Sequence, residues 1–202
     1  MLDGKARQLL DPVLDRIAKF LARLGIRANN VTLAAFAIGV LAAVAIANHY
    51  YLTGMVLLLI SRLGDGLDGA VARQTKKTDF GGYLDIVLDF AFYGMIPAAF
   101  VISDPSQNAI AGVVLILSFY VTGASFLAYA IIAEKHGLES TDRGSKSIYF
   151  TTGLAEATET IAVFVAFCLF PHWFVTIAGI YAAICFYTAL SRIIQAKNNF
   201  PD

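Results

Sequence analysis

The chain of 202 residues is short of charge, with 15% Asp, Glu, Lys and Arg, and it contains only five prolines and two cysteines. Its apolar fraction of 58% exceeds the roughly 45–50% of soluble domains, which excludes a large soluble domain and predicts an integral membrane protein. Cys168 and Cys185 lie in apolar runs without metal-ligand spacing, so we interpret both as packing residues. The net charge of zero gives no support for nucleic-acid binding.

The N-terminal segment lacks the unbroken apolar core and cleavage site of a removable signal peptide. Asp11 and Pro12 predict a helix start and Gly25 predicts its end, with apolar and basic residues on opposite sides between them. We expect this amphipathic helix to lie at the membrane interface, although a solvated helix docked on the protein is the alternative. The predicted domains are a cytoplasmic interfacial arm at 1–27 and a transmembrane domain at 28–202.

Six apolar segments follow this arm, and each approaches the length of about 20 residues that a spanning helix needs. They cover residues 31–48, 51–72, 81–103, 108–133, 146–170 and 173–194. Because a chain in lipid must satisfy its backbone hydrogen bonds internally, such segments are helical. The predicted fold class is an all-α membrane protein with six transmembrane helices preceded by the interfacial helix.

Lys and Arg are absent from alternate breaks between these segments, namely "NHYY", "SDPSQN" and "FPHW". The breaks "RQTKKTD" and "EKHGLESTDRGSK", together with both chain ends, carry the basic residues. By the positive-inside rule, we expect the termini and the basic breaks to face the cytoplasm, with the protein in the cell (inner) membrane. Tyr50, Tyr51 and Trp173 lie at the opposite ends of spans, where an aromatic belt is expected.

Four aspartates lie at the cytoplasmic ends of the second and third segments: Asp65, Asp68, Asp85 and Asp89. Residues three or four apart share a helix face, so each pair points one way. A short basic break joins the two helices, which we expect to be antiparallel neighbours with converging carboxylates. Uncompensated acids in a membrane cost several kcal/mol each, about 2.5–3.5 kcal/mol by insertion scales. Oxygen ligands without His or Cys favour hard divalent ions such as Mg²⁺ or Mn²⁺, and four carboxylates suffice for two ions.

Two features near these aspartates have alternative interpretations. Arg62, Arg73 and Lys76 would neutralise the acids if the acids formed only structural ion pairs. Glycines flank both aspartate pairs and permit close approach either of helices or of a ligand such as a diphosphate. These glycines are Gly64, Gly66, Gly69, Gly81 and Gly82. Arg73 is placed to bind the remaining charge of such a diphosphate.

The spacing of eight residues over 25 positions resembles the signature of the CDP-alcohol phosphotransferase (CDP-alcohol phosphatidyltransferase) family. The residues are Asp65, Asp68, Gly69, Ala72, Arg73, Gly81, Asp85 and Asp89. The six expected spans, the N-terminal helix and the "NNVT" that opens the first span also fit the family. The resemblance implies that an alcohol displaces CMP from CDP-diacylglycerol or another CDP-linked lipid to form a phospholipid, within a homodimer surrounded by membrane lipids.

The resemblance also implies roles for individual residues. Asp65, Asp68 and Asp85 would bind two divalent cations, Mg²⁺ or Mn²⁺, while Asp89 would also reach the metal and act as general base. Asp85 and Asp89 are therefore the predicted catalytic residues. The implied nucleotide and diphosphate site consists of Asp68, Gly69, Ala72, Arg73, Gly81, Asn30 and Thr32.

The alcohol acceptor stays open at the level of sequence. Ile86 and Phe90 replace residues that glycerol-phosphate members often carry, whereas Gly94 and Pro97 are similar to the pattern of serine-using members. Serine is therefore favoured over glycerol 3-phosphate or inositol phosphate. Bases that could bind an anionic acceptor, or else serve topology and headgroup contact, are Lys135, Arg143, Lys146 and Arg192.

Two acids of the fifth segment, Glu156 and Glu159, lie three residues apart. Because intramembrane acids generally face the bundle interior, they are candidates to line the acceptor pocket or to hold a cation such as a serine amine or Arg62. A polar packing contact is the alternative.

Two other functions use intramembrane carboxylates. Membrane prenyltransferases hold a diphosphate through aspartates and Mg²⁺, but their acidic motifs lie far apart in the chain. A divalent-cation transporter would distribute acids across the membrane. Here the four aspartates fall within 25 residues near one membrane face, which favours the phosphotransferase.

Overall fold

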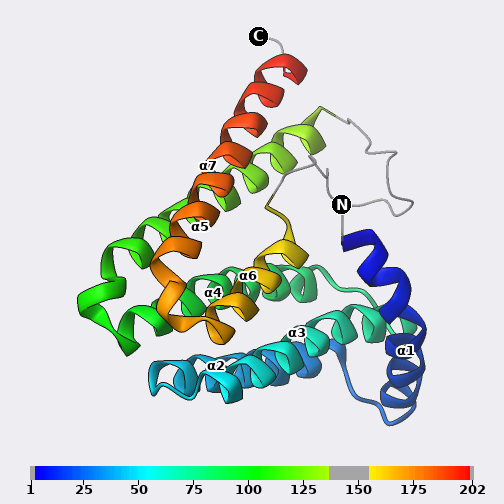
Figure 1. Ribbon diagram of the computed structural model, residues 1–202. Helices are drawn as coiled ribbons and strands as arrows, with labels where there is room; N and C mark the ends of the chain where they lie inside the picture. The colour runs from blue at the N-terminus through cyan, green and yellow to red at the C-terminus, as the bar shows by residue number, and fades with distance from the viewer. Residues whose placement is uncertain (1–2, 137–154, 201–202) are drawn as a thin grey trace.

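The computed structural model describes residues 3–136 and 155–200 (Figure 1). Within them the chain forms helices and no strand, which confirms the all-α prediction. The helices are α1 (Asp3–Arg23), α2 (Ala28–Ala47), α3 (Tyr51–Gln74), α4 (Asp79–Ser103), α5 (Pro105–Lys135), α6 (Ala157–Leu169) and α7 (Phe174–Asn199), with a short 3₁₀ helix, η1 (Pro171–Trp173), before α7.

Among the described residues, four helical segments are long and apolar enough to cross a membrane: α2, α4, α5 and the continuous segment formed by η1 and α7. The expected second span forms α3, whose 24 residues include charged side chains such as Arg62 and Asp68 that reduce its hydropathy. Of the expected fifth span, residues 146–154 lie outside the described residues, and the described part forms α6, whose 13 residues begin at Ala157 after two non-helical residues.

The first helix starts earlier than the sequence predicts. Helix α1 begins at Asp3 and continues through Pro12, so the expectation of a start at Asp11 and Pro12 is wrong. A proline inside a helix removes one backbone donor, and the helix here continues on both sides of it. Gly25 does end the helix, with φ +74°, and the amide of Ile26 donates to the carbonyl of Leu21 at 3.1 Å. This is the Schellman arrangement that favours glycine.

Helix α1 has two apolar stripes. Ala18 is fully buried and packs with Ala70 and Val71 of α3, so this stripe docks the helix on the rest of the protein. A second stripe is exposed and consists of Val13, Ile17, Phe20 and Leu24. Docking on the protein and exposure of an apolar stripe therefore occur together in this helix.

Helix α2 packs against both α3 and α4, while α5 packs against α4 and α7 (Figure 1). Helices α3 and α4 contact each other directly, since Arg62 of α3 donates to Asp89 of α4 at 2.6 Å, although their backbones pack less closely than those of α2 and α3. The backbones of α3 and α4 are spaced so that the two helices meet mainly through side chains. That spacing leaves room for polar groups between them.

Aromatic packing brings three breaks to one end of the bundle. Tyr51, at the start of α3, stacks on Phe100 of α4 with ring centroids 5.6 Å apart, and Phe100 stacks on Phe174 of α7 at 5.0 Å. The Tyr51 hydroxyl also lies 3.5 Å from the Ser103 hydroxyl. The three breaks without Lys or Arg therefore lie together, as the charge pattern predicts.

Candidate active site

Three of the four aspartates converge between α3 and α4. One carboxylate oxygen from each of Asp65, Asp68 and Asp85 lies within 4.8 Å of the others. The helical spacing of three residues aligns Asp65 with Asp68 on α3, and Asp85 approaches them from the second turn of α4. Such a group of oxygen atoms is suited to a hard divalent cation.

Asp68 carries the clearest sign that the cluster is built for a cation. Its side chain is only 6% exposed, and its Oδ2 is buried without a hydrogen-bond partner. A buried anionic oxygen without a partner is costly, and a bound cation would compensate it. The donor set therefore fits a divalent ion.

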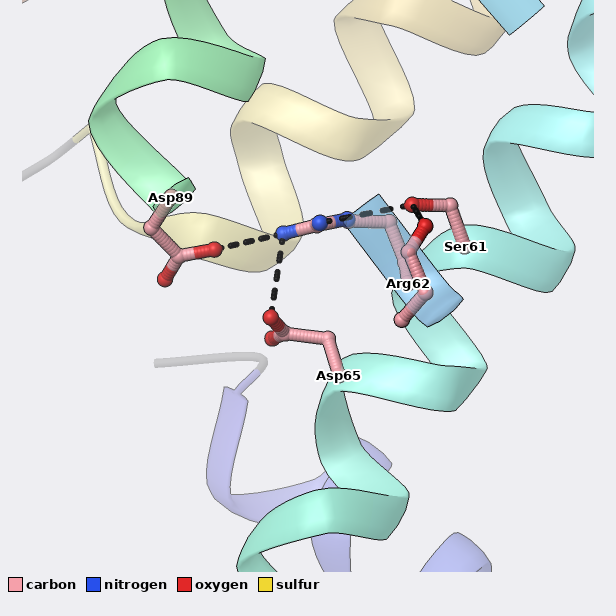
Figure 2. A network of polar contacts seen from close by, with 5 residues as sticks. Ser61, Arg62, Asp65 and Asp89 are labelled. Atoms are coloured by element: carbon pink, nitrogen blue, oxygen red, sulfur yellow. Dashed lines mark hydrogen bonds and ion pairs between the residues drawn. The ribbon is translucent and has the colours of Figure 1, made fainter. Parts of the chain in front are cut away.

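The fourth aspartate, Asp89, takes a different partner. Nη1 of Arg62 donates to Asp89 Oδ1 at 2.6 Å and lies 3.6 Å from Asp65 Oδ1. Figure 2 shows the guanidinium of Arg62 between these two carboxylates, with Ser61 on its other side. The Arg62 side chain is 8% exposed, so this ion pair is largely shielded from solvent.

Ion pairs involve only two of the four aspartates. Arg62 forms ion pairs with both Asp65 and Asp89, so one positive charge faces two carboxylates, while Arg73 pairs with Asp15 instead. Within residues 3–136 and 155–200, Asp68 and Asp85 have no ion-pair partner. Structural ion pairs alone do not explain why these two carboxylates converge.

The arginine expected to bind diphosphate lies at the last turn of α3. Nη2 of Arg73 lies 3.3 Å from Oδ1 of Asp15 on α1, and both side chains are nearly half exposed. A methyl group at Gly69 would lie 3.8 Å from Arg73 Nη1, which is an ordinary contact. The structure around Gly69 and Arg73 therefore has space beside the backbone.

Two of the other glycines serve helix packing. A Cβ at Gly64 would lie 2.8 Å from the Ala35 Cβ of α2, and one at Gly66 would lie 3.3 Å from Leu14 of α1. Gly82 has open space around it. The close approach of helices thus explains Gly64 and Gly66, and it does not explain Gly69 or Gly82.

The start of α2 lies beside the start of α4. Asn29 Oδ1 would lie 3.0 Å from a Cβ at Gly81, whereas Asn30 is exposed. Thr32 is buried, donates to the Ala28 carbonyl at 3.1 Å and has its hydroxyl close to the Asp68 carboxylate. Of the expected nucleotide-site residues, Asp68 belongs to the cluster and Thr32 lies beside it, while Ala72 is half-buried on α3.

A cavity of about 630 Å³ adjoins Asp89 between α4, α5, α6 and α7. Its walls are mostly apolar and aromatic, with a few polar groups. The polar lining residues are Asp89, Tyr93, Tyr120, Thr122, Glu156, Thr160 and Arg192. A largely apolar cavity with a few convergent polar groups is the usual form of a small-molecule site.

The candidate acceptor residues have different positions. Arg192 of α7 lines the cavity, is 7% exposed and donates to the Thr122 carbonyl at 3.1 Å. Glu156 lines the cavity at the residue before α6. Glu159 is not among the lining residues, and its Oε2 is buried without a hydrogen-bond partner. Arg143 and Lys146 lie outside the described residues.

Several contributors were not identifiable from sequence. Asp15 looked like part of the polar face of an isolated helix, and its contact with Arg73 bridges 58 positions of sequence. Thr122 and Thr160 are single hydroxyl residues in apolar segments, without a distinguishing pattern. The one available signal was the spacing of three residues between Arg62 and Asp65, which is typical of a helical ion pair.

Two solved structures of similar fold come from one enzyme. The phosphatidylinositol phosphate synthase of Mycobacterium tuberculosis (PgsA1) with CDP-DAG bound matches with a TM-score of 0.72 over 90% of this chain and 92% of that chain, at 21% identity. Its complex with manganese and citrate matches with a TM-score of 0.71, over 89% of this chain and 87% of that chain, at 22% identity. These similarities establish the fold.

Sequence relatives extend over nearly the whole chain. The inner membrane protein YnjF of Escherichia coli is 46% identical over 96% of this chain and 94% of its own length. The archaetidylinositol phosphate synthase of Methanothermobacter thermautotrophicus is 31% identical over 93% of this chain and 88% of its own. A sequence model of the CDP-alcohol phosphatidyltransferases matches residues 25–190, which include every residue of the signature. With this match and the aspartate cluster in place, the chain belongs to the CDP-alcohol phosphatidyltransferase family.

Proposed function

We propose that this protein transfers the phosphatidyl group of CDP-diacylglycerol to a small alcohol and releases CMP, in phospholipid biosynthesis. The observation that carries the proposal is the convergence of Asp65, Asp68 and Asp85 within 4.8 Å, beside a cavity that Asp89 lines. A diphosphate site next to a pocket for a second substrate is what such a transfer requires.

For the acceptor, we propose a polyol phosphate of the inositol phosphate type. The synthases that make archaetidylinositol phosphate and phosphatidylinositol phosphate are similar in sequence and in fold respectively, which supports this class. The nearly buried Arg192 on the cavity wall offers a guanidinium to a phosphate. Serine, which the Gly94 and Pro97 pattern favours, is the alternative.

In the proposed reaction, the acceptor oxygen forms a bond to the phosphatidyl phosphorus as the bond from that phosphorus to the CMP oxygen breaks. The proton of the attacking hydroxyl passes to the carboxylate of Asp89, which lies on the cavity wall. Arg73 would hold the diphosphate, and Thr32, Asn30, Ala72, Gly69 and Gly81 would line the nucleotide. CMP leaves as a phosphate monoester.

Asp65, Asp68 and Asp85 would hold two divalent cations, with Asp89 able to reach them. Manganese in a solved structure of similar fold supports this assignment. A bound divalent ion supplies neutralisation of the diphosphate and stabilisation of charge on the phosphate oxygens. The chain's own contribution is to fix the carboxylates between α3 and α4 with Asp68 buried.

The proposed membrane arrangement has six spans, formed by α2 to α5, α7 and a fifth span that includes α6. The exposed stripe of α1 would lie in the membrane interface, which divides the chain into an interfacial arm at 1–27 and a catalytic domain at 28–202. The termini and the site would face the cytoplasm, since the basic break between α3 and α4 adjoins the site. The family resemblance supports a homodimer.

The test uses the purified protein with labelled CDP-diacylglycerol and a panel of alcohols: inositol phosphate, glycerol 3-phosphate, inositol and serine. We expect CMP release to require Mg²⁺ or Mn²⁺, to be lost in Asp89→Asn, and to yield one lipid product, identified by mass. Arg192→Gln should raise KM for a phosphate-bearing acceptor by about tenfold or more, because one charge-assisted contact is lost. Arg16→Gln, on the exposed face of α1, is the charge-matched control.

Other outcomes would redirect the assignment. Turnover of serine alone, unaffected by Arg192→Gln, would replace the polyol phosphate by serine. Turnover of a prenyl diphosphate without a CDP-lipid would identify a prenyltransferase. Metal-ion flux into sealed vesicles without any CMP release would identify a cation transporter.

A further inference from the structure

We propose that Arg62 is a positioning residue that fixes the carboxylate of Asp89, the proposed proton acceptor, beside the cluster of Asp65, Asp68 and Asp85. This inference rests on the proposed function, because Asp89 takes its role as proton acceptor from that function. It adds a residue outside the eight-residue signature to the working site.

A single nitrogen of Arg62 contacts both Asp89 and the aspartate cluster. Nη1 lies 2.6 Å from Oδ1 of Asp89 and 3.6 Å from Oδ1 of Asp65 (Figure 2). Because the guanidinium is planar and its stem is fixed on α3, this nitrogen sets the separation between the base and the cluster. Only Oδ1 of Asp89 takes part in the contact. Because this contact fixes the carboxylate group, it also fixes the direction in which Oδ2 points.

The guanidinium itself is held from two further sides. Its Cζ lies 3.8 Å from the ring centroid of Phe92, which is fully buried on α4 and provides a cation–π contact. Nη2 donates to the Ser61 hydroxyl at 3.4 Å, and that hydroxyl donates to the Ala35 carbonyl at 2.8 Å. Arg62 therefore has little freedom to follow Asp89 if the carboxylate moves.

A close approach of α2 backs these supports. A Cβ at Gly39 would lie 2.8 Å from Cδ2 of Phe92 and 3.0 Å from the Ser61 hydroxyl oxygen. The backbone of α2 thus abuts both groups that hold Arg62. The contacts that hold Arg62, and through it Asp89, therefore come from the packed interior of α2, α3 and α4. Such packing suits a catalytic group that must stay in place.

Arg62 acts through Asp89 rather than on the substrate. Asp89 lines the 630 Å³ cavity, and Arg62 is absent from its described lining residues. A residue that only positions the base should change the rate of the chemical step more than the binding of CDP-diacylglycerol. As a cation beside the cluster, it should also oppose the binding of a divalent ion.

The experiment compares Arg62→Met and Arg62→Lys in the full chain. Steady-state CMP release gives kcat and KM, and Mn²⁺ binding without substrate is measured by electron paramagnetic resonance. For Arg62→Met we expect kcat to fall about 100-fold with KM changed less than about threefold. Mn²⁺ binding should tighten about fivefold, because a nearby positive charge is gone. Arg62→Lys should keep the Mn²⁺ affinity and regain about tenfold in kcat.

Weakened Mn²⁺ binding in Arg62→Met, or kcat within about twofold of wild type, would overturn the proposal. If Arg62→Met does not fold, Arg62→Lys tests the proposal. A kcat equal to that of wild type in Arg62→Lys, or a changed Mn²⁺ affinity, would contradict positioning by the guanidinium. Tyr51→Phe, which removes a hydroxyl at the opposite end of α3, is the control and should leave both readouts unchanged. Failure of the proposed function would give a different result from failure of this inference. The wild type would then release no CMP, while the comparison of Mn²⁺ binding would still report on Arg62.

Discussion

Arg73 lies 3.3 Å from Asp15, so the last turn of α3 is joined to the N-terminal helix by an ion pair between residues 58 positions apart. Arg73 is also the signature arginine proposed to hold the diphosphate. Arg73 therefore has two partners, Asp15 in this structure and the diphosphate in the proposed function.

Arg73→Gln should raise KM for CDP-diacylglycerol by about tenfold or more, because a charge-assisted contact to the diphosphate is lost. Asp15→Asn should change the stability by no more than about 1 kcal/mol, since both partners are nearly half exposed and such pairs are weak. Kinetics in mixed micelles and denaturation midpoints measure the two effects. A larger loss of turnover in Asp15→Asn than in Arg73→Gln would contradict this division of roles.

Asp68→Asn should weaken Mn²⁺ binding by about tenfold or more, because its buried Oδ2 is the cluster oxygen that lacks any partner. The amide keeps the shape of the side chain and removes its charge. Binding is measured in the absence of CDP-diacylglycerol, so the result does not depend on activity. Asp104→Asn, at the start of α5, is the matched control. Equal Mn²⁺ affinity in both variants would argue against an ion at the cluster.

Gly64→Ala should destabilise the protein by about 1–3 kcal/mol, because the new methyl would lie 2.8 Å from the Ala35 Cβ, which cannot rotate away. Gly179→Ala, on α7, meets nothing within 4 Å and should stabilise it by up to about 1 kcal/mol. Titration with a denaturing detergent measures the difference between the variants. Equal effects would show that α2 and α3 can separate at Gly64 without cost.

Asp104 predicts a local dependence on pH at the start of α5, in the break between α4 and α5. Its carboxylate accepts from the Ser106 hydroxyl at 2.7 Å and from the Gln107 amide at 3.1 Å. These hydrogen bonds, with that from Ser106 the larger influence, lower the pKa of Asp104 below its ordinary value. A lowered pKa in the folded state means that the stabilisation is present above the ordinary Asp value of about 3.9 and is lost as pH falls through the folded value.

Hydrogen exchange at Gln107 measures this effect. Protection should decline as the solution is acidified below about pH 4, and Asp104→Asn should remove the decline, because asparagine caps the helix without titrating. Unchanged protection of the wild type on acidification would count against the capping role of the carboxylate.

Helical spacing placed Asp65 beside Asp68, and Gly25 marked the end of α1, since both depend on local backbone geometry. The spacing of residues in the sequence did not predict that Asp85 lies in the cluster while Asp89 forms an ion pair with Arg62. The separation of Asp85 and Asp89 by four residues would equally permit both to bind one ion.

The sequence by itself determined the helical class, most helix limits to within a few residues, the family signature and the grouping of the breaks without Lys or Arg, because each depends on local periodicity, composition or the order of charges. Only the tertiary structure decided that α3 and α4 meet through side chains, that Arg62 pairs with Asp89, and that a cavity adjoins that carboxylate. The physical reason is that these outcomes depend on distances between helices. Those distances follow from how side chains such as Phe92 fill the space against Gly39, and packing of this kind leaves no period in the sequence.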